Sequence, residues 1–262
     1  MREKRSVVPF GPAVLLAMSV NLSNAAALPA SDAAGLLAAR SMTEEQYLER
    51  IVPVFKELYG PMAEPAAKLI WRNAGPVFAM DAMTRCYGEI WALQGPLGVK
   101  ERSLATVSAL VAQRLYPEIK LHINGFLSSG GTLEELCGFI ALAAQEAGGE
   151  RMAELRDAIV AGLQWREQSL PGYKAPAHDE VKRLMLARDA VSPQQALLAR
   201  LSAAIGLGDM DKVSAHMAAL ARDLPASVNR DAFMDQLVVH LVLYCGYPRG
   251  LNAIHEWQKQ RQ

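Results

Sequence analysis

Helical patterns of apolar and polar residues occupy most of the chain after residue 43, and no segment has the strict alternation of a β-strand. The clearest case runs from Lys100 to Leu115, where the apolar spacing suits a largely buried helix. The pattern predicts helices over residues 43–58, 64–73, 77–93, 100–115, 118–128, 132–147, 150–167, 178–188, 193–205, 210–222, 229–244 and 247–260.

Turn and capping residues separate these segments. Thr132 followed by Glu135 is a capping box, and Thr43 precedes two acidic residues of a first helical turn. Glycine and proline mark the breaks, which fall at residues 59–61, 94–98, 129–131 and 148–149. The clearest linker is the stretch of residues 171–177, which contains Pro171-Gly172 and Pro176.

The order of elements repeats across this linker. A helix, a histidine-bearing helix, a turn, a helix, a glycine turn and a further helix occur before the linker and again after it. The repeat predicts an all-α protein with a first helical unit at residues 43–170 and a second at residues 178–262.

The first residues are typical of an export signal. A basic start with Arg2, Lys4 and Arg5 precedes an apolar run, and small residues follow at 25–27. We therefore predict a signal peptide at residues 1–27, a leader at 28–42, and a periplasmic or secreted mature protein that does not associate with the membrane after signal removal. The alternative is an apolar extension retained on a cytoplasmic protein.

Composition narrows the possible partners. The chain has 27 Lys+Arg and 27 Asp+Glu, so its balanced charge gives no electrostatic reason to expect nucleic acid as a partner. Aromatic residues make up only 6%, and Leu and Ala are abundant, which favours helices. The three cysteines lack metal-ligand spacing and their odd number argues against a complete disulfide framework, so we expect no metal site.

The first unit carries a candidate acid/base pair. Glu118 and His122 are four residues apart on a predicted helix, so a carboxylate could orient the imidazole and favour its protonated form. The alternative is a surface ion pair of little energetic value. Arg102 begins another helix, where a guanidinium could bind a carboxylate, or could simply be solvated.

The second unit carries His216, His240 and Cys245. His240 lies in an apolar run, so its ring is either a functional group or a core histidine bonded to a carbonyl. Cys245 follows it as a small apolar residue or, as a weaker hypothesis, as the thiol of an antioxidant.

Ordered motifs in the first unit resemble the carboxymuconolactone decarboxylase family. In this sequence they are Tyr87-Gly88-Glu89-Ile90-Trp91, Glu101-Arg102-Ser103-Leu104, Glu118-Ile119-Lys120-Leu121-His122, Gly130 and Thr132-Leu133-Glu134-Glu135-Leu136. The family pattern continues with a histidine and a Tyr-x-Gly-x-Pro turn. Leu142 stands in the place of that histidine, whereas the second unit supplies His240 and Tyr244-Cys245-Gly246-Tyr247-Pro248. The resemblance thus predicts two degenerate tandem units that form one pseudo-symmetric domain.

The resemblance implies a cofactor-free, all-helical enzyme that assembles as a homo-oligomer. In the family's namesake reaction a carboxylated muconolactone loses CO₂, which requires a cation for the carboxylate and a proton donor for the carbanion. We assign catalysis to His122, Glu118 and His240, and substrate binding to Arg102, His216, Cys245 and Trp91. A sister branch of peroxidases needs a Cys-x-x-Cys pair, but Leu115 and Glu118 occupy those places.

Two functions therefore follow from the sequence. The first is a cofactor-independent lyase or isomerase that acts on a small carboxylated lactone or a related carboxylate. The alternative is a non-catalytic or small-molecule-binding member of the fold, because a fold does not fix a function. Fusion of two units also predicts fewer chains per oligomer than the rings of single-unit relatives.

Overall fold

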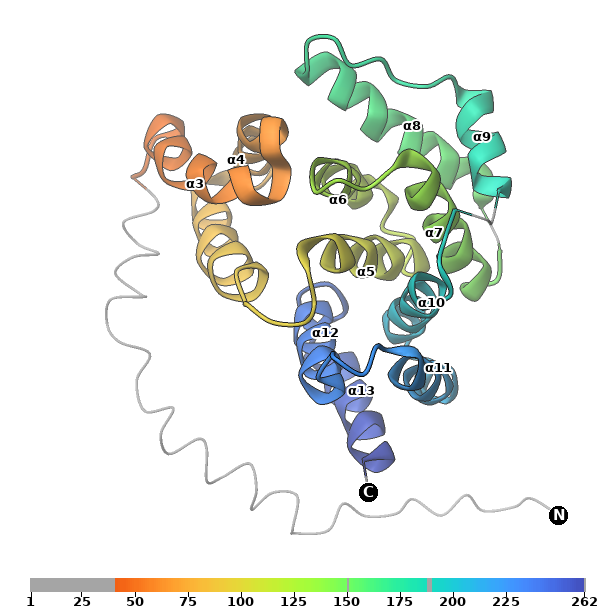
Figure 1. The fold of residues 1–262 in the computed structure, drawn as a ribbon. Helices are drawn as coiled ribbons and strands as arrows, with labels where there is room; N and C mark the ends of the chain where they lie inside the picture. Colours follow the sequence, from red (N-terminus) through yellow and green to blue (C-terminus); the bar gives the residue numbers. More distant parts are fainter. Residues whose placement is uncertain (1–40, 150, 188–189, 262) are drawn as a thin grey trace, which may run out of the picture.

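The computed structural model describes residues 41–149, 151–187 and 190–261. The predicted signal peptide and nearly all of the predicted leader lie outside these residues, so both stay predictions. Within the described part of the chain every regular element is a helix, which confirms the all-α fold class (Figure 1). No helix among these residues is long and apolar enough to cross a membrane.

The helices follow the predicted order. Their bounds are α3 (Glu44–Tyr59), η1 (Gly60–Met62), α4 (Ala63–Asp81), η2 (Ala82–Trp91), α5 (Val99–Ala112), α6 (Tyr116–Ser128), α7 (Leu133–Glu146), α8 (Met152–Ser169), α9 (His178–Leu186), α10 (Pro193–Leu207), α11 (Met210–Asp223), α12 (Arg230–Cys245) and α13 (Tyr247–Gln260). Most ends lie within three residues of the prediction, because glycine, proline and capping residues mark them.

The segment between residues 63 and 91 departs most from the prediction. Gly75 has φ 74° and ψ 172°, so α4 is kinked there, and Pro76 follows inside the helix. Glycine adopts this backbone without strain, whereas proline cannot donate to the helical ladder. The chain then winds as a π-helix, η2, up to Trp91. A π-helix is rare and often occurs at functional sites, but its wider winding leaves no simple mark in a sequence.

The predicted capping box at the start of α7 is confirmed. The Glu135 backbone N–H donates to Thr132 Oγ1 at 3.1 Å, and the Thr132 N–H donates to Glu135 Oε2 at 2.9 Å. Lys100 Nζ also lies 2.8 Å from Glu135 Oε1, which ties the start of α5 to the start of α7.

Helix α5 is the centre of the larger hydrophobic core. Its residues 102–112 are all buried, and α6, α7, α10 and α12 pack around it (Figure 1). Helix α10 crosses α5 at very close range, because a Cβ atom at Gly206 would lie only 3.0 Å from the Ala109 carbonyl oxygen. This crossing joins the two halves of the chain backbone to backbone.

A smaller core holds most of the buried aromatic side chains. Tyr47, Phe55, Tyr59, Tyr87 and Trp91 are buried between α3, α4 and η2, which lie together on one side of the molecule (Figure 1). Helices α6 and α12 border this core through contacts with α3 and η2 respectively. The functional candidates lie where the aromatic core meets these two helices.

The helices of the two halves pack reciprocally. Helix α6 packs on α5 as α11 packs on α10, while α7 contacts α10 and α12 contacts α5. A tandem repeat predicts such an arrangement, and the repeat itself stays a prediction. The linker region between α8 and α9 has no regular element, and α9 beyond it packs on α7 and α8 of the first half.

Candidate functional site

Two histidines from opposite halves of the chain meet on the side chain of Trp91. The His122 ring, from α6, stacks on the indole with centroids 6.0 Å apart and planes 12° apart. The His240 ring, from α12, meets the same indole edge-on at 4.8 Å. The structure therefore brings together three of the residues that the sequence singles out.

Two further polar side chains complete this group. Trp91 Nε1 donates a hydrogen bond of 2.9 Å to the Tyr244 hydroxyl, and Thr106 Oγ1 lies 2.8 Å from His240 Nε2. The Tyr244 ring also lies 5.2 Å from the His122 ring and 5.6 Å from the His240 ring, measured between centroids. We call Trp91, Thr106, His122, His240 and Tyr244 the Trp91 cluster.

Both imidazoles of the Trp91 cluster are buried and uncharged at neutral pH. His122 is 5% exposed and His240 is 1% exposed. Burial lowers the pKa of each ring to about 3, and the positive charge of Arg102 acts in the same direction on His240. Among the described residues, Nδ1 of each ring has no hydrogen-bond partner. Buried ring nitrogens without partners are uncommon in folded proteins and suggest a role beyond packing.

Arg102 supports the cluster from α5. Its guanidinium donates hydrogen bonds to the carbonyl oxygens of Trp91 and Leu93, so it holds the backbone that leaves η2. It also lines a cavity of about 150 Å³, together with Trp91, Tyr87 and the loop at residues 92–98. Two guanidinium nitrogens of Arg102 that we expected to bind a substrate carboxylate therefore already donate to backbone carbonyl oxygens.

The expected pairing of Glu118 with His122 is wrong. Glu118 is exposed in the first turn of α6, whereas His122 lies one turn later against the Trp91 ring. No hydrogen bond or ion pair joins the two side chains among the described residues, and the pKa of His122 moves opposite to the direction that a carboxylate would cause. Helical spacing placed the residues four apart, but tertiary packing decided their environments.

His216 belongs to a different group of side chains. Its Nε2 lies 3.4 Å from Oε1 of the buried carboxylate of Glu146, which also pairs with Lys212 at 3.1 Å and Arg200 at 3.4 Å. Burial by itself raises the pKa of Glu146, but the bonds to Lys212 and His216 outweigh it and hold that pKa below the usual value. No contact joins His216 to the Trp91 cluster among the described residues.

Cys245 follows Tyr244 but is a poor nucleophile. Burial raises the pKa of its thiol to about 12, although Arg249 acts in the opposite direction. Its Sγ accepts a weak hydrogen bond from Gln113 Nε2 at 3.7 Å. Because a thiolate is the reactive form of cysteine, this environment does not favour thiol chemistry.

Sequence reasoning missed Thr106 as a site residue and used Tyr244 only as part of a turn motif. A signal was available for each: Thr106 is a polar residue one turn after Arg102 on a buried helix, and Tyr244 is one turn after His240. No three His, Cys, Asp or Glu side chains of the described residues are placed to share a metal ion.

One comparison with known proteins gives a match that covers part of this site. A family model described as the carboxymuconolactone decarboxylase family matches residues 79–161, which include Trp91, Arg102, Thr106 and His122. His240 and Tyr244 lie outside the matched residues. A search of curated proteins finds no match for the chain.

Proposed function

Because a model of the carboxymuconolactone decarboxylase family matches residues 79–161, we propose that this protein is a cofactor-independent enzyme for a small carboxylated lactone or a related carboxylate. Decarboxylation is the first candidate reaction, and isomerisation or ring opening is the second. The observation that carries the proposal is the convergence of His122 and His240 on Trp91, each with an Nδ1 that has no hydrogen-bond partner in the part of the chain that the structure describes.

The chemistry requires a site for the carboxylate and a group that handles a proton. Loss of CO₂ breaks the bond to the carboxyl carbon and leaves its electron pair on the substrate, where a proton must be added. Neutral imidazoles can accept or donate a hydrogen bond at Nδ1, and the dry surroundings strengthen such bonds. Because both rings are neutral, we propose that the proton comes from water and that His122 and His240 pass it to the substrate. We leave Glu118 out because it is exposed and forms no pair with His122 among the described residues.

We propose that the substrate enters the site through the cavity that Arg102 and Trp91 line. The cavity that they line holds about 150 Å³, which is smaller than the roughly 300–1,000 Å³ of most small-molecule sites. The Trp91 ring contacts both imidazoles, whereas neither imidazole lines the cavity. We therefore propose that a substrate carboxylate approaches Arg102 in the cavity and that Trp91 must shift before the substrate meets His122 and His240.

Turnover of a panel of γ-carboxylactones by the purified protein tests this function. His122→Gln and His240→Gln should each lower kcat/KM by about 10²- to 10⁴-fold, the usual loss for an acid/base group. Glutamine keeps a polar side chain at each buried position, and circular dichroism would confirm that each variant folds. His255→Asn is the matched control, because His255 is exposed on α13. Unchanged turnover in His122→Gln would remove that residue from the mechanism.

Small-molecule binding without turnover is the second candidate. The nearly complete burial of both imidazoles and the use of Arg102 by backbone carbonyls favour it. In that case a lactone would change the fluorescence of Trp91 without being consumed, and Trp91→Phe would abolish the change. Assembly as a homo-oligomer stays a prediction, and sedimentation would count the chains.

A further inference from the structure

A second hollow lies between α4 and α8. It has a volume of about 530 Å³, within the range of small-molecule sites. Its lining residues are Pro61, Glu64, Pro65, Lys68, Leu69, Arg72, Asn73, Trp165 and Ser169. We call it the α4–α8 groove, and it contains none of the residues of the Trp91 cluster.

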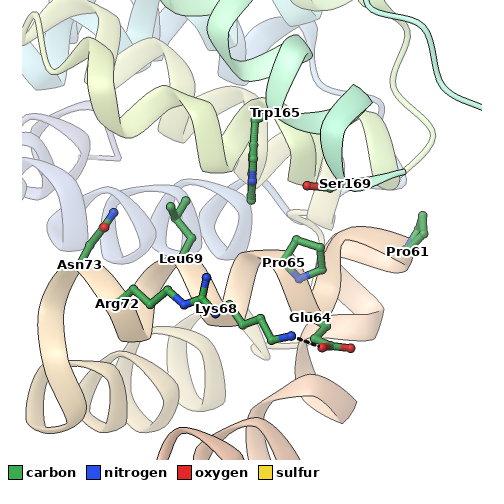
Figure 2. A pocket seen from close by; sticks show the side chains of 9 residues that line it. All are labelled: Pro61, Glu64, Pro65, Lys68, Leu69, Arg72, Asn73, Trp165 and Ser169. Atoms are coloured by element: carbon green, nitrogen blue, oxygen red, sulfur yellow. Dashed lines mark hydrogen bonds and ion pairs between the residues drawn. The ribbon is translucent and has the colours of Figure 1, made fainter. Parts of the chain in front are cut away.

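The α4–α8 groove combines apolar walls with a cationic edge. Figure 2 shows Trp165 extending from α8 toward α4, where Leu69 points back at it, with Ser169 on α8 and Pro65 on α4 beside them. Lys68 and Arg72 are four residues apart on α4 and lie along one side of the groove. A flat apolar body would fit between Trp165 and Leu69, with an anionic end at the two cations.

The ion pairs already present at this edge can exchange for a ligand. Lys68 Nζ lies 2.5 Å from Glu64 Oε1, and Arg72 Nη2 lies 3.4 Å from Glu44 Oε1. The side chains of Lys68 and Glu64 are 37% and 56% exposed, and those of Arg72 and Glu44 are 66% and 33% exposed. Such partly exposed pairs contribute little in water, so an anion that also buries apolar surface can replace the carboxylates.

Two further features favour an anion with hydrogen-bond acceptors. The Trp165 indole N–H and the Asn73 amide are hydrogen-bond donors on side chains that line the groove. On α6, Lys120 Nζ lies 4.8 Å from the centroid of the Trp165 ring and adds a third cation beside this wall.

From these observations we propose that the α4–α8 groove binds a small, flat organic anion such as an aromatic carboxylate. Arg72 and Lys68 hold the anionic group, and Trp165, Leu69 and Pro65 contact the ring. The proposal does not depend on the reaction at the Trp91 cluster.

Calorimetric titration of the full chain with 2-naphthoate tests the proposal. We expect saturable binding, with 2-naphthamide and acetate each at least about tenfold weaker because one lacks the charge and the other lacks the ring. Arg72→Gln should raise the Kd of 2-naphthoate about tenfold through the loss of a charge-assisted hydrogen bond. The matched control is Arg85→Gln, because Arg85 is a similarly exposed arginine paired with Asp81 outside the groove.

The location of binding is tested separately by nuclear magnetic resonance. The indole N–H signal of Trp165, assigned with Trp165→Phe, should move on addition of 2-naphthoate, and His122→Gln should bind it as tightly as the wild type. Three results would overturn the proposal: no saturable binding up to about 10 mM, an equal Kd for wild type and Arg72→Gln, or a shift confined to the Trp91 signal.

Discussion

The environment of His122 and His240 has a consequence for stability as well as for chemistry. Their pKa falls from 6.5 to about 3 on folding, so between these values the unfolded chain binds protons that the folded chain does not. The stability that depends on these neutral rings is therefore fully present above pH 6.5 and is lost as the pH falls toward 3.

We expect the free energy of unfolding to decrease by about 1.4 kcal/mol per pH unit for each imidazole across that window. Urea unfolding of wild type and of a His122→Gln/His240→Gln variant between pH 4.5 and 6.5 measures the difference in slope. The variant should show the shallower pH dependence, whereas His255→Asn should keep the wild-type slope. Parallel curves for wild type and the double variant would contradict the low pKa of both rings.

Residue identities were easier to predict than residue partners. The sequence indicates His240 because it interrupts an apolar run, and Arg102 because it begins a helix after a Gly-Pro break. Trp91 and His122 are candidates because they lie in motifs that resemble the family. It pairs His122 with Glu118, since helical spacing is the only geometry available before folding, yet the actual neighbour is Trp91. The sequence groups His216 with His240 by its place in the repeat. In the structure, however, His216 lies beside the buried carboxylate of Glu146.

Among the elements, the crossing of α5 and α10 brings two helix backbones close together at a single glycine, Gly206. Glycine normally weakens a helix relative to alanine by about 1 kcal/mol. At Gly206 that preference should reverse, because a Cβ would lie 3.0 Å from the Ala109 carbonyl oxygen and 3.2 Å from its Cα. Backbone atoms of a buried helix cannot move aside as a side chain can.

We therefore expect Gly206→Ala to destabilise the protein by about 1–3 kcal/mol, the usual cost of overpacking a core. Gly162→Ala on α8 is the matched control, since a Cβ there would meet Ile123 and Lys120 only at 3.4 and 3.5 Å. That control should be neutral or stabilising by up to about 1 kcal/mol. Thermal unfolding of both variants checks the opposite signs, and a gain in stability for Gly206→Ala would contradict the close crossing.

Helix ends and helix interiors differ in how well a sequence predicts them. Capping residues and glycine turns act locally, which is why the start of α7 at Leu133 follows directly from Thr132. The π-helical winding of η2 has no short sequence motif, and it places Tyr87 against the Phe55 and Tyr59 rings of α3. The position of Trp91 in the site thus came from tertiary packing.

At the scale of the whole molecule, the two halves share the larger hydrophobic core and one candidate site. Helix α5 of the first half is covered by α10 of the second, and the Trp91 cluster takes His122 from one half and His240 from the other. The family match at residues 79–161 therefore describes a segment that lacks part of its own core and part of the site.

We predict that residues 41–170 expressed alone will not fold cooperatively, because α5 would expose apolar surface to water. A protease site inserted in the linker at residues 171–177 provides the comparison. After cleavage, the two fragments of the folded chain should stay associated in gel filtration. A separate first fragment that unfolds cooperatively at the melting temperature of the full chain would contradict this prediction.

The 153 residues between Trp91 and Tyr244 also set an order of events during synthesis. At about 5–20 residues per second, a ribosome needs roughly 8–30 s to extend the chain from one to the other. Throughout that interval the indole and His122 lack their partners from α12. The apolar face of α5 stays uncovered until α10 has been made. The nascent chain is therefore most exposed to aggregation before residue 207, and it can acquire a complete Trp91 cluster only after α12 has emerged.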